Sequence, residues 1–110
     1  MGFAPGLYVT ATPIGNARDI TLRALDLLAA CDVIVAEDTR VTAKLLAIHG
    51  LSKPMKIYNE HVADRAGPEI LKRIAEGAVV ALVSDAGTPL LSDPGGRLVR
   101  EALAQGLNVV

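Results

Sequence analysis

Aromatic residues are nearly absent from this sequence. Its 110 residues include two Tyr, one Phe and no Trp, although 51% of the chain is apolar, so its core must be built from Ala, Val, Leu and Ile. The single cysteine, Cys31, excludes an internal disulfide and suits a reducing compartment, and we therefore expect a cytoplasmic protein. It follows an apolar helical stretch, which indicates a buried side chain rather than a reactive thiol. With one Cys and two His, no metal site is predicted.

Long apolar runs and an excess of one charge are also lacking. No apolar stretch approaches the ~20 residues that a membrane span needs, and no secretory signal is visible, so we expect no membrane partner. The net charge is −1, which argues against a simple module that binds nucleic acid through a general basic field. An enzyme that touches RNA with a few local cations stays possible.

What the sequence does contain is a regular alternation of short apolar segments and amphipathic ones. We expect strands at 7–11, 33–36, 55–58, 79–83 and 107–110, with a helix after each of the first four. This pattern predicts an α/β fold: a five-stranded, mostly parallel sheet with helices on both faces and right-handed crossovers. Because the last strand should feed a further loop, we expect residues 1–110 to be one domain of a longer protein.

Apolar spacing also predicts which helix faces are buried. Asp19 or Thr21 should cap the first helix, and Pro68 should be the first residue of the third, where proline is tolerated. The second helix should cover 41–49 and the fourth about 95–105. The residues expected to pack inward are Leu22, Leu25, Leu28 and Ala29 in the first helix and Val41, Leu45 and Ile48 in the second.

The segment 79–96 is the one around which the chain is organised. Its solid apolar run is typical of a strand buried on both faces, and the run breaks abruptly into Ser84-Asp85-Ala86-Gly87-Thr88-Pro89. Ser92-Asp93-Pro94-Gly95 then resembles a helix start, with Asp93 as N-cap. Ligands of open α/β sheets bind at the carboxyl ends of strands, and this loop is longer than the ~2–6 residues of a plain connection. These features favour a ligand site over a simple turn.

Polar residues follow the other strands as well. Pro13 and Asn16 come after the first strand, and Glu37-Asp38-Thr39-Arg40 comes after the second. Parallel strands place these ends on one rim of the sheet. The second group has two interpretations: Asp38 or Thr39 caps the next helix, or the acids take part in chemistry. Capping accounts for one acid but not for two acids and an Arg, so both interpretations stay open.

Several longer motifs occur here in order. They are Thr12-Pro13-Ile14-Gly15-Asn16, Asp19-Ile20-Thr21-Leu22-Arg23-Ala24-Leu25, Glu37-Asp38-Thr39-Arg40 and the two motifs within 84–95. Together they closely resemble the tetrapyrrole (corrin/porphyrin) methylase family, and within it the methyltransferases of small-subunit ribosomal RNA. The resemblance runs from Leu7 onward. It covers only the amino-terminal domain of such a protein, without the carboxyl-terminal domain that completes the cofactor site. The family does not use a G-x-G-x-G loop, and none is present.

The resemblance implies an S-adenosyl-L-methionine-dependent 2′-O-methylation of a cytidine in 16S rRNA of the 30S subunit, by a homodimer with a cleft between two domains. It implies cofactor contacts, largely through backbone, at Pro13, Val83, Ser84, Asp85, Ala86, Gly87 and Thr88. A ribose hydroxyl needs a general base, and the candidates at the rim are Glu37 and Asp38. The candidates for substrate binding are Arg40, which would hold an RNA phosphate, Asn16 and Asp93.

Three other readings compete with this one. A tetrapyrrole C-methyltransferase of the same superfamily would share the sheet and the cofactor loop. The 110 residues alone could instead be a non-catalytic folding or dimerisation module, because half of the cofactor pocket is missing. A nucleotide-binding sensor is a distant third, since no phosphate loop of recognised spacing is present.

Overall fold

Four parallel strands form a single sheet in the order β1-β4-β2-β3. The computed structural model describes residues 2–12, 17–85 and 95–110. The elements are β1 (Gly6–Thr12), the short 3-10 helix η1 (Ala17–Asp19), α1 (Leu22–Ala30), β2 (Val33–Ala36), α2 (Thr39–Ile48), β3 (Met55–Ile57), α3 (Ala63–Ala75), β4 (Val79–Asp85) and α4 (Gly95–Ala104). The predicted α/β class with a parallel sheet is confirmed.

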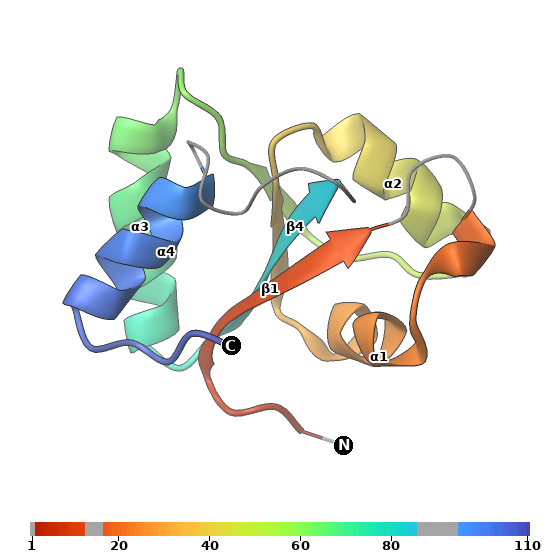
Figure 1. Ribbon diagram of the computed structural model, residues 1–110, viewed down its shortest axis with the longest axis horizontal. Helices are drawn as coiled ribbons and strands as arrows, with labels where there is room; N and C mark the ends of the chain where they lie inside the picture. Colours follow the sequence, from red (N-terminus) through yellow and green to blue (C-terminus); the bar gives the residue numbers. More distant parts are fainter. Residues whose placement is uncertain (1, 13–16, 86–94) are drawn as a thin grey trace.

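Helices cover both faces of the sheet, with α1 and α2 on one side and α3 and α4 on the other (Figure 1). Alternation along β2 shows how one strand supplies both layers. Val33 and Val35 pack with the core under α3 and α4, whereas Ile34 and Ala36 pack with the core under α1 and α2. A strand that is apolar at every position thus suits a sheet that is buried on both faces.

Strand β4 lies in the middle of the sheet and pairs with both β1 and β2. Val80 and Ala81 are fully buried, and residues 79–83 are buried throughout. The side chain of Asp32, just before β2, accepts a hydrogen bond from the backbone N–H of Val79 at 2.8 Å. This bond fixes the start of β4 against β2. The organising role predicted for this segment agrees with its central place.

The prediction of a fifth strand at 107–110 is wrong, although this segment does lie beside β1 at the edge of the sheet. The segment meets the outer edge of β1 through one isolated parallel bridge between Leu7 and Val109. The N–H groups of Leu7 and Val9 donate to the carbonyls of Asn108 and Val110. A Cβ on Gly6 would lie 2.8 Å from the Asn108 carbonyl oxygen, so the approach requires glycine. One bridge is too short a ladder to form a strand.

The buried face of α1 differs from the predicted one. Thr21 caps the helix, and its hydroxyl accepts from the N–H of Ala24, as one of the two alternatives predicted. The buried residues are Ala24, Leu27, Leu28 and the following Cys31, which keep the spacing i, i+3, i+4, i+7. Of the four residues predicted to pack inward, Leu28 is confirmed, whereas Leu22 is 80% exposed, Ala29 is exposed and Leu25 is half-buried. The sequence allows two adjacent apolar stripes, and the stripe that includes the small Ala24 and Cys31 faces the sheet.

The same shift occurs in α2. Thr42, Leu45 and Leu46 are buried, whereas Val41 and Ile48 are exposed, contrary to the prediction for those two. Only Leu45 belongs to both the expected and the observed face. Because Leu45 and Leu46 are adjacent, the sequence is again compatible with two different buried faces of the helix.

Helix α3 begins before Pro68, so the prediction that this proline opens the helix is wrong. The side-chain oxygen of Asn59 accepts hydrogen bonds from the N–H groups of His61 at 2.9 Å and Val62 at 3.2 Å. This turn directs the chain into a helix at Ala63. Pro68 therefore lies inside the helix, where it removes one intrahelical hydrogen bond.

Cys31 lies at the end of α1 and is buried, as predicted. Its thiol donates to the carbonyl of Leu28 at 3.3 Å, and the ammonium group of Lys53 donates to the backbone carbonyl of Cys31 at 3.1 Å. Burial raises the pKa of the thiol above its ordinary value. The side chain is therefore a protonated part of the core.

The two leucines of α1 provide a direct test of the observed face. Leu28 is fully buried, so Leu28→Ala should lower the free energy of unfolding by about 2–5 kcal/mol through lost burial and a cavity. The matched change Leu22→Ala, at an exposed position on the same helix, should change it by no more than about 0.5 kcal/mol. Urea unfolding followed by circular dichroism measures both. Equal losses in the two variants would contradict the observed packing.

Candidate active site

The polar ends of three strands lie on one rim of the sheet. Thr12, the last residue of β1, is in register with Asp85, the last residue of β4. Ala36, the last residue of β2, is in register with Val83. Glu37 and Asp38 therefore leave the sheet on the same side as the end of β4. The convergence predicted from the sequence is confirmed for these residues.

The connections on either side of β4 lead to opposite faces of the sheet. The chain passes from β4 to α4 on one face, whereas β1 and β2, its two neighbours, lead to α1 and α2 on the opposite face (Figure 1). In open α/β sheets, ligands bind in the crevice next to adjacent strands whose connections diverge in this way, so the end of β4 is the place where a ligand is expected. Ala11, Ala36 and Ser84 supply small side chains near the strand ends.

Asp38 forms the N-cap of α2. Its Oδ1 accepts from the backbone N–H of Arg40 at 3.0 Å, and the Arg40 guanidinium donates to Oδ1 and Oδ2 at 3.3 Å each. The side-chain hydrogen bond from Arg40, followed by the backbone one, holds the pKa of Asp38 below its ordinary value. The capping interpretation is thus correct for Asp38. A carboxylate with a lowered pKa is also a weaker proton acceptor, which disfavours it as a general base.

Glu37 differs from Asp38 in its surroundings. It is exposed at the end of β2, and in the described part of the chain it takes no part in the cap. Its carboxylate is therefore available at the rim. Arg40 is also available, because its side chain is 88% exposed and its ion pair with Asp38 is screened by solvent. A phosphate can compete with Asp38 for this guanidinium.

The structure places only part of the predicted cofactor site. Val83 is buried with its side chain in the core under α1 and α2, so a ligand would meet its backbone, and Ser84 is half-buried. Asp85 ends β4 on the rim. The other predicted site residues, Pro13, Asn16, Ala86, Gly87, Thr88 and Asp93, lie outside the described residues.

One interaction beside the site was not predicted. Arg97, in the first turn of α4, donates to Asp64 of α3 and to Glu101, both at 2.7 Å. These carboxylates raise the pKa of its guanidinium, and they fix α4 against α3. The spacing of Arg97 and Glu101 is a usual helical pair that the sequence could have revealed. The contact with Asp64 depends on the packing of two helices and has no sequence signal.

Comparison with known proteins decides the family. The model of the Tetrapyrrole (Corrin/Porphyrin) Methylases matches residues 6–110. The chain belongs to this family. A cobalt precorrin-4 methyltransferase of cobalamin biosynthesis has the same fold as this methylase domain, with a TM-score of 0.75 and 22% identity over 94% of this chain and 43% of that one. A conserved hypothetical protein of Aeropyrum pernix K1 has a TM-score of 0.70 and 25% identity, over 98% of this chain and 38% of that one.

Curated methylase relatives are more similar in sequence. The ribosomal RNA small subunit methyltransferase I of Mesorhizobium japonicum is 55% identical over 106 residues, which are 96% of this chain and 36% of that protein. The protein of the same name from Rickettsia prowazekii is 52% identical over 96 residues, 87% of this chain and 34% of its own length. The chain thus spans about a third of the length of these relatives.

Methyl transfer in this methylase family implies S-adenosylmethionine in general, and the described rim fits such a group. Its sulfonium is positive, and the exposed carboxylate of Glu37 follows β2 at the same rim as the end of β4. The described residues contain no cluster of three or more His, Cys, Asp or Glu arranged to bind a metal ion.

The titration of Asp38 gives a testable pH dependence. The pKa of its carboxyl is lower in the folded protein than in the unfolded chain, so the ionised cap stabilises the folded state at pH values above the ordinary carboxyl pKa. This stabilisation is lost as the pH falls through the pKa of the folded state. Asp38→Asn keeps an acceptor that caps a helix but cannot ionise. Between about pH 5 and pH 2 we expect this variant to lose less stability than the wild type, as measured by urea unfolding at each pH. Identical acid dependence in the two proteins would show that the cap gains nothing from ionisation.

Proposed function

We propose that residues 1–110 are the amino-terminal α/β domain of a two-domain, S-adenosyl-L-methionine-dependent methyltransferase that acts on the 2′-hydroxyl of a cytidine in 16S rRNA. The observation that carries this proposal is the identity of 45–55% to relatives named ribosomal RNA small subunit methyltransferase I over nearly the whole chain. The fold alone would not distinguish RNA from a tetrapyrrole as substrate. We further propose a cytoplasmic homodimer that meets the 30S subunit. Within the described chain, no helix is long and apolar enough to cross a membrane.

The cofactor would lie in the crevice at the end of β4. The backbone of Val83, Ser84 and Asp85 would form its floor, and Pro13 and Ala86–Gly87–Thr88 would complete the site from the two loops that follow β1 and β4. When bound, S-adenosylmethionine supplies an electrophilic methyl group. The task of the protein is therefore to align the ribose hydroxyl and to exclude water, which can contribute about 7–11 kcal/mol of barrier lowering.

Glu37 is the general base in this proposal. It follows β2, directly beside the end of β4. Its carboxylate would accept the proton of the ribose hydroxyl as the hydroxyl oxygen bonds to the methyl carbon, while the bond from that carbon to the sulfonium sulfur would break and leave a neutral thioether. A base of this kind contributes roughly 10²- to 10⁴-fold. Asp38 serves instead as the cap that fixes Glu37 and Arg40 relative to α2. Arg40 would bind a phosphate of the RNA, and Asn16 and Asp93 would contact the substrate from the loops.

The reaction itself is tested by mapping ribose methylation of 16S rRNA in cells with and without the gene of the full-length protein. We expect one 2′-O-methylated cytidine to disappear with the gene and to return on complementation. An unchanged methylation map would refute the proposed function. Tritiated methyl transfer to 30S subunits, compared with transfer to uroporphyrinogen, tests the tetrapyrrole alternative directly.

The base assignment predicts a contrast between neighbouring carboxylates. In the full-length protein, Glu37→Gln should lower turnover by about 10²- to 10⁴-fold, because the variant cannot accept the hydroxyl proton. Asp38→Asn, which retains a cap, should keep turnover within about an order of magnitude. Single-turnover methyl transfer at saturating RNA measures both. Wild-type turnover in Glu37→Gln would remove Glu37 from the mechanism, and a larger loss in Asp38→Asn would reverse the two roles.

The remaining alternative concerns the 110 residues by themselves. We expect them to bind S-adenosylmethionine poorly, because the second domain would supply the rest of the pocket. Calorimetry with this chain decides between a binding domain and a non-catalytic folding or dimerisation module. Micromolar affinity of the isolated chain would contradict our expectation.

A further inference from the structure

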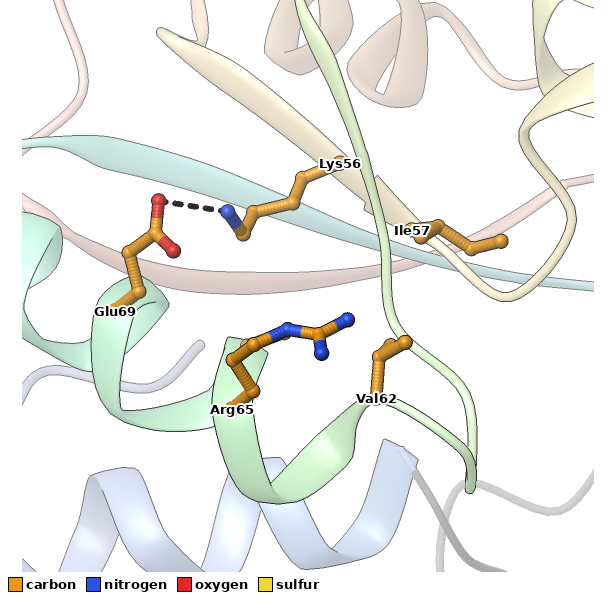
Figure 2. Close-up of a pocket in the computed structure, with 6 residues that line it drawn as sticks. Lys56, Ile57, Val62, Arg65 and Glu69 are labelled. Atoms are coloured by element: carbon orange, nitrogen blue, oxygen red, sulfur yellow. Dashed lines mark ion pairs between the residues drawn. The ribbon is translucent and has the colours of Figure 1, made fainter.

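A small pocket lies beside the edge strand of the sheet, outside the site described above. It is lined by Lys56, Ile57, Val62, Arg65, Ala66 and Glu69, which come from β3, from the start of α3 and from the residue before it (Figure 2). Its volume is about 120 Å³. This space is large enough for a few water molecules or for a group of the size of a phosphate.

The pocket carries a net positive charge. Lys56 and Glu69 form an ion pair at 2.7 Å, and this bond from Lys56 holds the pKa of Glu69 below its ordinary value, so both groups are charged and compensate one another. In the part of the chain that the structure describes, no acidic side chain pairs with the guanidinium of Arg65. The neighbouring acid, Asp64, is bound to Arg97 instead. One positive charge of the lining is thus left uncompensated.

The side chains are arranged so that an anion could be held between them. Figure 2 shows Lys56 and Glu69 turned toward one another on one side of the pocket, with the Arg65 guanidinium extending toward Val62 and Ile57. Arginine in this position offers several N–H donors in one plane, which matches the oxygens of a phosphodiester. The rest of the lining is apolar and comes from Ile57, Val62 and Ala66. The net positive charge of the pocket favours an anionic ligand such as a nucleic-acid backbone.

The position of the pocket relates it to the proposed active site. Ile57 ends β3 and is in register with Ala36, the residue before Glu37. The pocket therefore begins on the same rim, and β3 lies two strands from β4, or about 10 Å at the usual spacing between strands. Arg40 follows β2, the strand between β3 and β4 in the sheet order.

We propose that Arg65, assisted by Lys56, binds a backbone phosphate of the RNA strand close to the nucleotide that is methylated. This inference rests on the proposed function, which supplies the RNA. The phosphate would enter the pocket beside the Lys56–Glu69 pair and accept hydrogen bonds from both cations. Such a contact fixes the register of the strand without reading its sequence.

The test compares RNA binding by variants of the full-length protein over a range of salt concentrations. Arg65→Gln should lower the affinity for 16S rRNA about three- to tenfold and reduce the slope of log affinity against log salt by about 0.7. Glu69→Gln frees Lys56 and should act in the opposite direction, with tighter binding and a steeper slope. Lys72→Gln, an exposed position of α3 outside the pocket lining, is the matched control and should leave the slope closer to wild type. Affinity for S-adenosylmethionine should be unchanged in all three.

The outcomes separate this inference from the proposed function. If the wild type methylates and binds RNA but Arg65→Gln behaves like Lys72→Gln, the pocket proposal alone is overturned. If Arg65→Gln changes the oligomeric state and not RNA binding, the pocket belongs to a protein interface and the proposal is again overturned. If the wild type neither binds nor methylates RNA, both fail. Weaker binding in Arg65→Gln together with tighter binding in Glu69→Gln supports the phosphate site.

Discussion

The parallel pairing of β4 with β1 on one side and β2 on the other is the constraint on which the rest of the structure depends. It aligns Thr12 with Asp85 and Ala36 with Val83, and so brings the ends of three strands that are far apart in the sequence to one rim. Burial of both faces stabilises this arrangement, because β4 contributes alternately to the two cores. Without the central strand β4, the proposed cofactor site and the cations beside it would not lie on the same edge of the sheet.

The acidic segment after β2 shows how one loop can serve stability and chemistry with adjacent residues. Asp38 is occupied by the start of α2 and by Arg40, whereas Glu37 is exposed one residue earlier. The cap orients the backbone on which Glu37 stands, so the two acids have separate roles in the proposed mechanism. A sequence motif of consecutive charged residues hides such a division, because only the geometry shows which carboxylate the helix uses.

The alternation of apolar segments was enough to predict the class of fold, and most observed strands and helices lie within two residues of the predicted ranges. The common rim followed from parallel connectivity alone. The faces of α1 and α2 could not be predicted, because paired leucines allow two stripes and only the sheet selects one. Pro68 misled the prediction for α3 because Asn59 provides the earlier turn. The sequence did not indicate that Arg65 and Lys56 lie close together, because their proximity depends on how α3 packs along the edge strand β3.

The buried state of Cys31 has a practical consequence. It is the one cysteine among the 110 residues, and burial keeps its thiol protonated and shielded from reagents. A cysteine introduced at an exposed rim position such as Ala11 would therefore be the sole readily alkylated thiol of this chain. A fluorophore or spin label attached there would report on the crevice without removal of the native sulfur.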